Sequence, residues 1–284
     1  MPTRSPNALA DKLSLRSKKN FYNVYESFDW NEPIPPNEFW LEPSLLSTYG
    51  TEIHESCGQA RLRELSKWET INLFSVFCTG EADLIHEIAS RMNHPGLEKY
   101  FDYLNHFIDE ENKHMWFFRH FSLYYSGKTY EVKKMQFGNG SSDLMGDFMA
   151  FMKIVLFEEF GDLFNVAVIG SKMVPSVIVK IHTMHHKDEA GHILIGREIC
   201  AILFARLSEL NPMEAGKATN YLVKYLKYVL ESMYNPQVYA DAGFENPYEF
   251  RSQLMDHPAR KRIHQEMISG ILRHYPTIFR EKML

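Results

Sequence analysis

Apolar residues recur every three or four positions over most of the chain, which is the spacing of an amphipathic helix. The spacing predicts four long helices, over residues 66–92, 97–125, 144–171 and 175–207. Proline and glycine end the first of them at His94-Pro95-Gly96, where a helix is hard to continue. The pattern therefore predicts an all-α fold with four core helices in succession.

The two ends of the chain show a weaker helical pattern. Residues 1–50 contain the closely spaced prolines Pro33, Pro35, Pro36 and Pro43. We expect this segment to wrap over the core in an extended form with short helices. Residues 235–284 are expected to form a C-terminal extension of loop and two short helices. Further helices are expected over 53–64 and 211–234.

Length and composition agree with a helical protein that has a substantial core. The chain has 284 residues, of which 45% are hydrophobic, and this suits one large domain or two small ones. Because the four long helices follow one another directly, we expect a single domain over residues 1–284, with its core over about 66–207.

Charge and cysteine content exclude several classes of protein. The net charge of -5 disfavours nucleic acid as a partner, and charged residues interrupt every apolar run before it could span a membrane. The N-terminal residues have no apolar signal-peptide core. The cysteines, Cys57, Cys78 and Cys200, are too widely spaced for a disulfide framework or a thiolate zinc site. We expect a cytoplasmic protein without membrane partners, for which a homodimer is left open.

Two short stretches repeat one pattern, an acidic residue followed by Glu-x-x-His. They are Glu110-Glu111-Asn112-Lys113-His114 and Asp188-Glu189-Ala190-Gly191-His192. Residues three apart share a helix face, so the Glu and His of each stretch can bind one metal ion together. Two such motifs on facing helices, with a lone Glu from each of two other helices, form the dinuclear iron or manganese centre of ferritin-like bundles.

The first lone glutamate is expected to be Glu81. It lies on an apolar stripe formed by Phe74, Cys78, Ile85 and Ile88. Burying a carboxylate without a partner is costly, so its place on this stripe needs a functional reason. A single inward Glu can also pair with a core Arg or Lys, and a single Glu-x-x-His is common, so the prediction depends on the whole set.

The third long helix offers two adjacent glutamates. At 100° per residue, Glu158 falls with Asp143, Asp147, Asp162 and Asn165, which predicts a solvated face. Glu159 falls with Phe148, Met152, Val155, Leu163 and Val166. The sequence therefore predicts that Glu159, rather than Glu158, points inward as the second lone ligand.

A third histidine, His185, lies one helical turn before Glu189 and shares its face, so it is either a further ligand or a hydrogen-bonded core residue; we expect a ligand. The predicted metal ligands are thus Glu81, Glu111, His114, Glu159, His185, Glu189 and His192. Four carboxylates nearly balance two divalent cations, and this mixture of donors suits iron or manganese. Glu110 and Asp188, which precede the ligand glutamates, are expected to accept the second N–H of a ligand histidine.

The order Glu, Glu-x-x-His, Glu, His-x-x-x-Glu-x-x-His resembles the para-aminobenzoate N-oxygenase (AurF-like) family of diiron oxygenases. The resemblance covers about residues 66–207 and implies a ferritin-like bundle with two iron ions. It also implies that an external electron donor reduces the iron and that dioxygen then oxygenates the nitrogen of a small amine. In that family an aryl amine becomes a hydroxylamine, nitroso or nitro compound during small-molecule biosynthesis.

Three other functions are compatible with the same ligands. A diiron centre can also catalyse C–H hydroxylation, desaturation or oxidative cleavage. A ferritin-like protein can store iron, although the long terminal extensions and the 20 phenylalanines of the chain argue against a storage shell. A metal-binding scaffold without turnover is the third.

Overall fold

The computed structural model describes residues 7–132 and 143–279. Within these ranges the chain forms helices joined by loops, and no strand is present. The helices are α1 (Ala8–Lys19), α2 (Glu52–Ser56), α3 (Gln59–Arg91), α4 (Phe101–Ser126), α5 (Asp143–Ile169), α6 (Ser176–Leu210), α7 (Pro212–Ser232), α8 (Pro236–Asp241), α9 (Pro247–Asp256), α10 (Pro258–Leu272) and α11 (Pro276–Phe279). The predicted all-α fold is confirmed.

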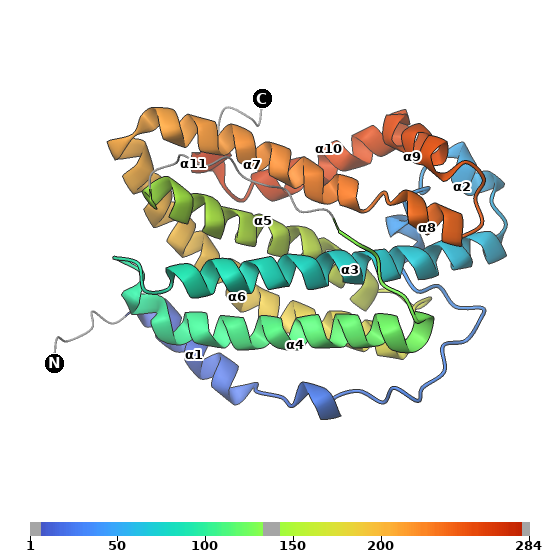
Figure 1. The fold of residues 1–284 in the computed structure, drawn as a ribbon, viewed down its shortest axis with the longest axis horizontal. Coiled ribbons are helices and arrows are strands. Elements are labelled where there is room, and N and C mark those ends of the chain that lie inside the picture. Colours follow the sequence, from blue (N-terminus) through green and yellow to red (C-terminus); the bar gives the residue numbers. More distant parts are fainter. Residues whose placement is uncertain (1–6, 133–142, 280–284) are drawn as a thin grey trace.

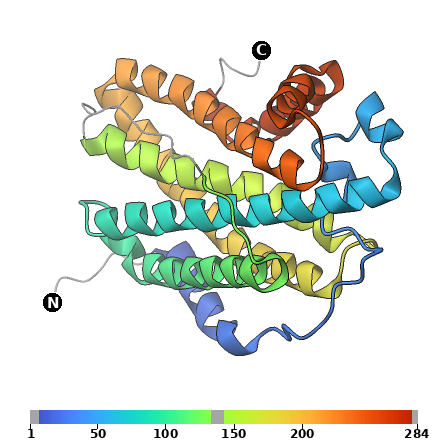
Figure 2. The same cartoon turned by 45° about the vertical axis from the view of Figure 1, so that its right-hand side comes forward.

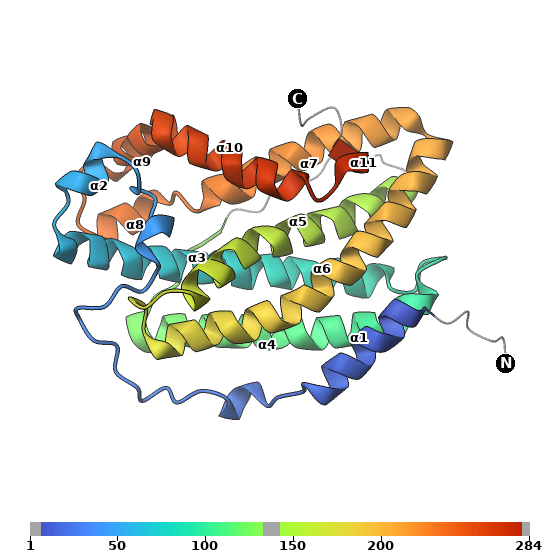
Figure 3. The ribbon, with the colours of Figure 1, turned by 180° about the vertical axis from the view of Figure 1, so that it is seen from behind.

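Four long helices form the core of the molecule. Helices α3 and α4 pack as one pair and α5 and α6 as a second, and the pairs meet through α3 with α5 and α4 with α6 (Figure 1). Helix α7 covers α5 and α6, whereas α1 lies against α4 and α6 at the opposite side (Figure 3). This is the ferritin-like bundle that the sequence predicts.

The ends of several predicted helices differ from the structure. Helix α3 runs without a break from Gln59, where two helices over 53–64 and 66–92 were expected. The C-terminal extension holds four helices, α8 to α11, instead of two, and its last residues, 280–284, lie outside the described ranges (Figure 2). Each of these four helices begins with a proline, whose fixed φ angle suits the first helical turn. The prolines therefore mark helix starts that apolar spacing alone does not locate.

Glycine residues allow the core helices to approach closely. A Cβ atom at Gly196 of α6 would collide with the side chain of Val155 on α5. A Cβ atom at Gly191 would lie 2.5 Å from the hydroxyl oxygen of Tyr103 on α4. Since Gly191 precedes His192, these contacts bring α4, α5 and α6 together at the level of the predicted metal ligands.

The described part of the N-terminal segment lies against the core helices. After α1, the chain crosses α4, where the hydroxyl of Tyr125 lies within hydrogen-bond distance of two backbone carbonyls, those of Trp30 and Glu32. Further on, the backbone N–H of Phe39 donates to the carbonyl of Met173, between α5 and α6. Within the described ranges, no helix is both long and apolar enough to cross a bilayer.

A buried polar cluster joins this N-terminal segment to α3, α10 and the residues that follow α7. Both carboxylate oxygens of Glu69 accept from the backbone N–H of Ser47, at 3.1 and 3.2 Å. Arg260 donates to the hydroxyl of Tyr234, 2.8 Å away. A cavity of about 70 Å³ adjoins these groups. Burial raises the pKa of Glu69 to about 7, although hydrogen bonds from Ser47 and the charge of Arg260 act in the opposite direction.

The raised pKa of Glu69 predicts a loss of stability with rising pH. Between its ordinary value of 4.5 and about 7, the folded chain holds a proton that the unfolded chain releases, so stability falls with pH in this window. This shift in pKa corresponds to a loss of about 3 kcal/mol in the free energy of unfolding over the window. Glu69→Gln, which cannot ionise, should unfold at higher urea concentration than the parent at pH 8 and show no such gain at pH 4.5. A gain of equal size at both pH values would contradict the assignment.

Candidate metal centre

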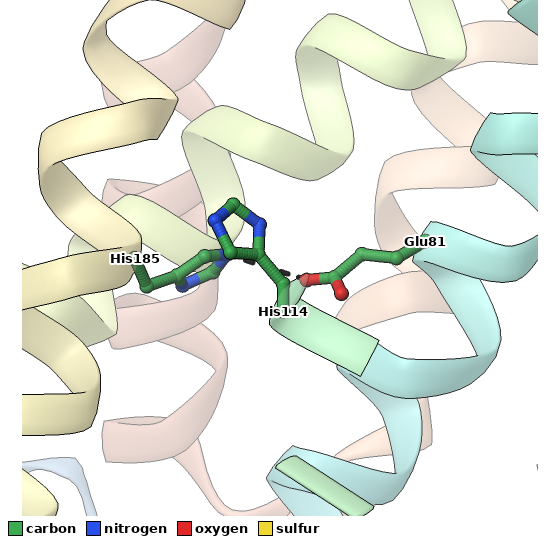
Figure 4. A group of neighbouring side chains, drawn as sticks. All are labelled: Glu81, His114 and His185. Carbon is green, nitrogen blue, oxygen red and sulfur yellow. Dashed lines mark ion pairs between the residues drawn. The ribbon is translucent and has the colours of Figure 1, made fainter. Parts of the chain in front are cut away.

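Acidic and imidazole side chains from the four core helices meet in the interior of the bundle. Ligand atoms of Glu81 (α3), His114 (α4) and His185 (α6) lie within 4.8 Å of one another (Figure 4). Those of Glu111, Glu158, Glu189 and His192 form a second group by the same measure. All seven residues are buried. We call the first group position 1 and the second group position 2.

Glu111 and Glu189 each reach both positions. The two carboxylate oxygens of Glu111 lie 3.2 Å from Nδ1 of His114 and 2.8 Å from Nδ1 of His192. One oxygen of Glu189 lies 2.9 Å from Nε2 of His185, and its other oxygen lies 3.6 Å from Nδ1 of His192. These two carboxylates have the placement of ligands that bridge two ions, whereas Glu81 and Glu158 each face one position.

Polar residues outside the two groups hold the three histidines. Nε2 of His114 lies 3.2 Å from a carboxylate oxygen of Asp188, and Nε2 of His192 lies 2.8 Å from one of Glu110. These are the residues that the sequence predicts for this role. Nδ1 of His185 lies 3.1 Å from the amide oxygen of Asn165, which the sequence reasoning missed. Each contact leaves the other ring nitrogen directed at the carboxylates.

The predicted position of Glu159 is wrong. Its carboxylate points away from the two groups and accepts from Nε and a terminal nitrogen of Arg197, at 2.9 and 2.6 Å. It also contacts His274 and the hydroxyl of Tyr275, which lie in the C-terminal extension. The neighbouring residue, Glu158, takes the place expected of Glu159 in the cluster.

The apolar pattern of α5 misleads because this helix is surrounded on most sides. Helices α3, α6, α7 and α10 all contact it, so apolar residues occur around much of its circumference. Leu163 and Val166, which the apolar spacing assigns to the inward face, are 39% and 57% exposed. Asn165, which the spacing assigns to a solvated face, is fully buried and its amide oxygen contacts His182 and His185 of α6. A polar stripe on this helix therefore faces the interior.

The charges within the cluster shift each other's pKa values. Burial raises the pKa values of Glu81 and Glu189, and the nearby charge of Glu111 raises both further. Glu111 is also buried, but His192 and His114 outweigh that effect and lower its pKa to about 2. Burial lowers the pKa of both histidines, but Glu111 and their other acidic neighbours raise it well above its ordinary value. Positive charge at the centre of the cluster is thus strongly favoured.

Several buried atoms of the cluster make no hydrogen bond of good geometry, although some of them lie within ion-pair distance of one another. They are one carboxylate oxygen each of Glu81, Glu111 and Glu158, both oxygens of Glu189, and Nδ1 of His192. Buried polar atoms are almost always satisfied, so a set that converges on one place requires a ligand. Carboxylates mixed with imidazoles are hard and intermediate donors, which fit iron or manganese ions. The residues present therefore fit a dinuclear metal centre.

Aromatic side chains surround the cluster. The ring of Phe107 stacks on that of His192 at a centroid distance of 3.7 Å, and the rings of Phe118 and Phe77 lie 5.0 and 5.4 Å from that of His185. All three phenylalanines are buried. They keep bulk water from the ligands and lower the local dielectric constant.

A cavity of about 290 Å³ lies between α3, α5 and α7, close to this aromatic shell. The ring of Phe157 lies directly over Gly80, where a Cβ atom would collide with it, and both residues line the cavity. The residues that follow them in the chain are Glu81 and Glu158. The side chain of Phe77 lies between the cavity and the metal ligands. The centroid of its ring is 6.1 Å from that of Phe157 and 5.4 Å from that of His185.

Comparison with known proteins places this geometry in a family. Similar solved structures include a mutant R2-like ligand-binding oxidase with an aerobically reconstituted Mn/Fe cofactor, at 13% identity and a TM-score of 0.49, covering 92% of this chain and 93% of that one. An R2-like ligand-binding oxidase from Sulfolobus acidocaldarius matches at 17% identity and a TM-score of 0.44, covering 92% of this chain and 91% of that one.

No curated protein matches the chain. The family model of the p-aminobenzoate N-oxygenase AurF matches residues 3–277. The chain therefore belongs to the AurF family, and it is an oxygen-dependent oxidoreductase with a dinuclear centre of iron or manganese.

Proposed function

We propose that the protein is a diiron N-oxygenase that acts on the amino group of a small aromatic amine. The proposed ligands are Glu81, Glu111, His114, Glu158, His185, Glu189 and His192. The observation that carries the proposal is the set of buried carboxylate and imidazole atoms without well-formed hydrogen bonds, which converge from four helices on two adjacent positions. Membership of an N-oxygenase family supports nitrogen as the atom that is oxidised.

Two ferrous ions bound there would supply the two electrons that activation of dioxygen requires. The net first oxidation converts an amine, dioxygen, two electrons and two protons into a hydroxylamine and water. One oxygen atom forms the new N–O bond, and the other leaves as water. An external one-electron donor, such as a flavoprotein or an iron–sulfur protein, has to return the centre to its reduced state after each turnover.

The residues around the centre orient its ligand histidines and exclude water from it. Asp188, Glu110 and Asn165 fix the ring orientation and tautomer of the three ligand histidines. Phe77, Phe107 and Phe118 exclude bulk water, which would otherwise favour side reactions that waste the oxidant before the amine reacts.

The cavity beside Phe157 supports a small, flat substrate. Its volume of about 290 Å³ lies at the lower end of the range for ligand pockets. Apolar side chains, including Val76, Ile154 and Phe157, line it on the side of the aromatic shell. The polar residues Asp83, Glu87 and Lys153 lie in its lining as well, with Nζ of Lys153 3.5 Å from a carboxylate oxygen of Glu87. An aryl amine bound there would place its ring against Phe157, and the side chain of Phe77 would have to turn aside for its amino group to reach Glu81 and Glu158.

The proposal is tested by product analysis. Protein loaded with ferrous iron is mixed with a chemical reductant, ¹⁸O₂ and a panel of aryl amines, and the products are identified by mass spectrometry. We expect a hydroxylamine or a further N-oxidised product with one labelled oxygen atom per N–O bond. Oxygen on carbon with an untouched amine would favour a hydroxylase instead. Iron uptake far beyond two ions per chain, without product, would favour storage.

The placement of the substrate is tested by filling the cavity. Thr79→Trp adds bulk to the lining of the 290 Å³ cavity, and Met267→Trp does the same in the 70 Å³ cavity next to Glu69. We expect Thr79→Trp to lower kcat/KM for the best aryl amine at least tenfold with iron content unchanged, and Met267→Trp to leave it within twofold. The reverse ranking would move the substrate to the smaller cavity.

A further inference from the structure

A tyrosine from the N-terminal segment is linked to one of the proposed ligands. The hydroxyl of Tyr22 donates to a carboxylate oxygen of Asp188, 3.2 Å away. The same oxygen lies 3.2 Å from Nε2 of His114, whose Nδ1 faces Glu111 and Glu189. A hydrogen-bonded chain therefore runs from Tyr22 through Asp188 to a histidine of position 1.

The corresponding histidine of position 2 lacks this extension. Nε2 of His192 lies 2.8 Å from a carboxylate oxygen of Glu110. In the part of the chain that the structure describes, no other side chain is hydrogen-bonded to Glu110. The two histidines of the repeated motif thus have acidic partners of the same kind, but only the partner of His114 is itself held by a tyrosine.

The surroundings of Tyr22 fix it in place. The ammonium group of Lys113 lies over the rings of Phe21 and Tyr22, at 4.4 and 5.0 Å from their centroids. Lys113 in turn pairs with Asp109 at 2.5 Å on the same helix, α4. Helix α1, which ends just before this segment, packs against α4 and α6. The hydroxyl of Tyr22 is thereby presented to Asp188 from a defined direction.

We propose that Tyr22 is a positioning residue, which acts through Asp188 on His114 and raises the metal affinity of position 1 alone. Its hydrogen bond restricts the side chain of Asp188, and Asp188 then holds the imidazole of His114 in the tautomer with Nδ1 available to a metal ion. Outer partners of ligand histidines typically change metal affinity by about 10- to 100-fold. The N-terminal segment is on this view part of the metal centre. The inference rests on the ligand set proposed above.

The test uses variants that isolate one position at a time. Glu158→Gln removes a ligand from position 2 and leaves position 1 to be titrated, whereas Glu81→Gln does the opposite. Each is titrated anaerobically with Co²⁺, whose visible absorption reports its ligands. We expect Tyr22→Phe to weaken Co²⁺ binding about tenfold and to alter the spectrum in the Glu158→Gln background. In the Glu81→Gln background it should change neither.

A matched control separates positioning from general stability. Tyr100→Phe removes the same kind of hydrogen bond, from a tyrosine hydroxyl to the carboxylate of Glu198 at 2.7 Å, outside the cluster. It should lower the unfolding temperature of the metal-free protein without altering either titration. If Tyr22→Phe does the same, Tyr22 only anchors the N-terminal segment and the inference is overturned. Equal weakening at both positions also overturns it.

A double-mutant cycle tests the route through Asp188. Asp188→Ala, which removes the acceptor of both contacts, should itself weaken Co²⁺ binding at position 1, and adding Tyr22→Phe to it should have no further effect. Additive effects of the two substitutions would show that Tyr22 acts by another route. If the parent protein does not bind two ions, the proposed ligand set is wrong, and the inference about Tyr22 is then wrong as well. If the parent binds two ions and Tyr22→Phe behaves as the parent does, the inference alone fails.

Discussion

Glu158→Ala is expected to remove one of the two metal ions from each chain, whereas Glu159→Ala should retain both. The carboxylate of Glu158 belongs to position 2 with Glu111, Glu189 and His192, and one of its buried oxygens has no other partner. The carboxylate of Glu159 is already bound by Arg197 on the other side of α5. Iron per chain, measured after anaerobic loading with ferrous iron and gel filtration, should fall from about two to about one only in the first variant.

The two substitutions should also differ in the metal-free protein. Glu159→Ala leaves Arg197 without its carboxylate and removes the contacts to His274 and Tyr275, so it should lower the unfolding temperature. Glu158→Ala removes one of several repelling carboxylates, so it should stabilise the metal-free protein or leave it unchanged. Loss of iron from Glu159→Ala with full iron in Glu158→Ala would reverse the assignment.

The Glu-x-x-His motifs could be predicted from the sequence because they depend only on local geometry. Residues three or four apart share a helix face whatever the rest of the fold does, so Glu111 with His114 and His185 with Glu189 follow from helix formation alone. The apolar spacing of the four core helices is equally local, and it predicts where these helices run. The structure brings the residues of these motifs together in one buried cluster.

The choice between Glu158 and Glu159 is not local. It depends on which neighbours cover each side of α5, and the C-terminal extension supplies Tyr275 and His274 to bury Glu159. Polar residues on a helix usually face solvent, but Glu158 and Asn165 form a polar stripe directed at α6. Tyr22 is still harder to find from sequence, since it is 166 positions from Asp188 and lies in a segment without helical spacing.

Glu189→Ala should lose both metal ions, whereas Glu81→Ala should lose only one. The carboxylate oxygens of Glu189 face different positions, one toward His185 and the other toward His192. Removing it takes a donor from each ion and leaves their mutual repulsion less screened. Glu81 contacts His185 at 3.3 Å and belongs to position 1 alone, so position 2 keeps its complete set of donors in that variant.

Mn²⁺ gives the measurement for this pair of variants, because two Mn²⁺ ions joined by bridging carboxylates couple their spins and a single ion does not. The parent protein should show a coupled electron paramagnetic resonance signal and Glu81→Ala an uncoupled signal from one ion per chain. Glu189→Ala should show only ions free in solution. An uncoupled, tightly bound ion in Glu189→Ala would mean that Glu111 suffices to hold one position. A coupled pair in Glu81→Ala would mean that position 1 does not depend on the carboxylate of α3. If both results are as expected, the number of metal ions lost on removing a carboxylate equals the number of positions that this carboxylate faces.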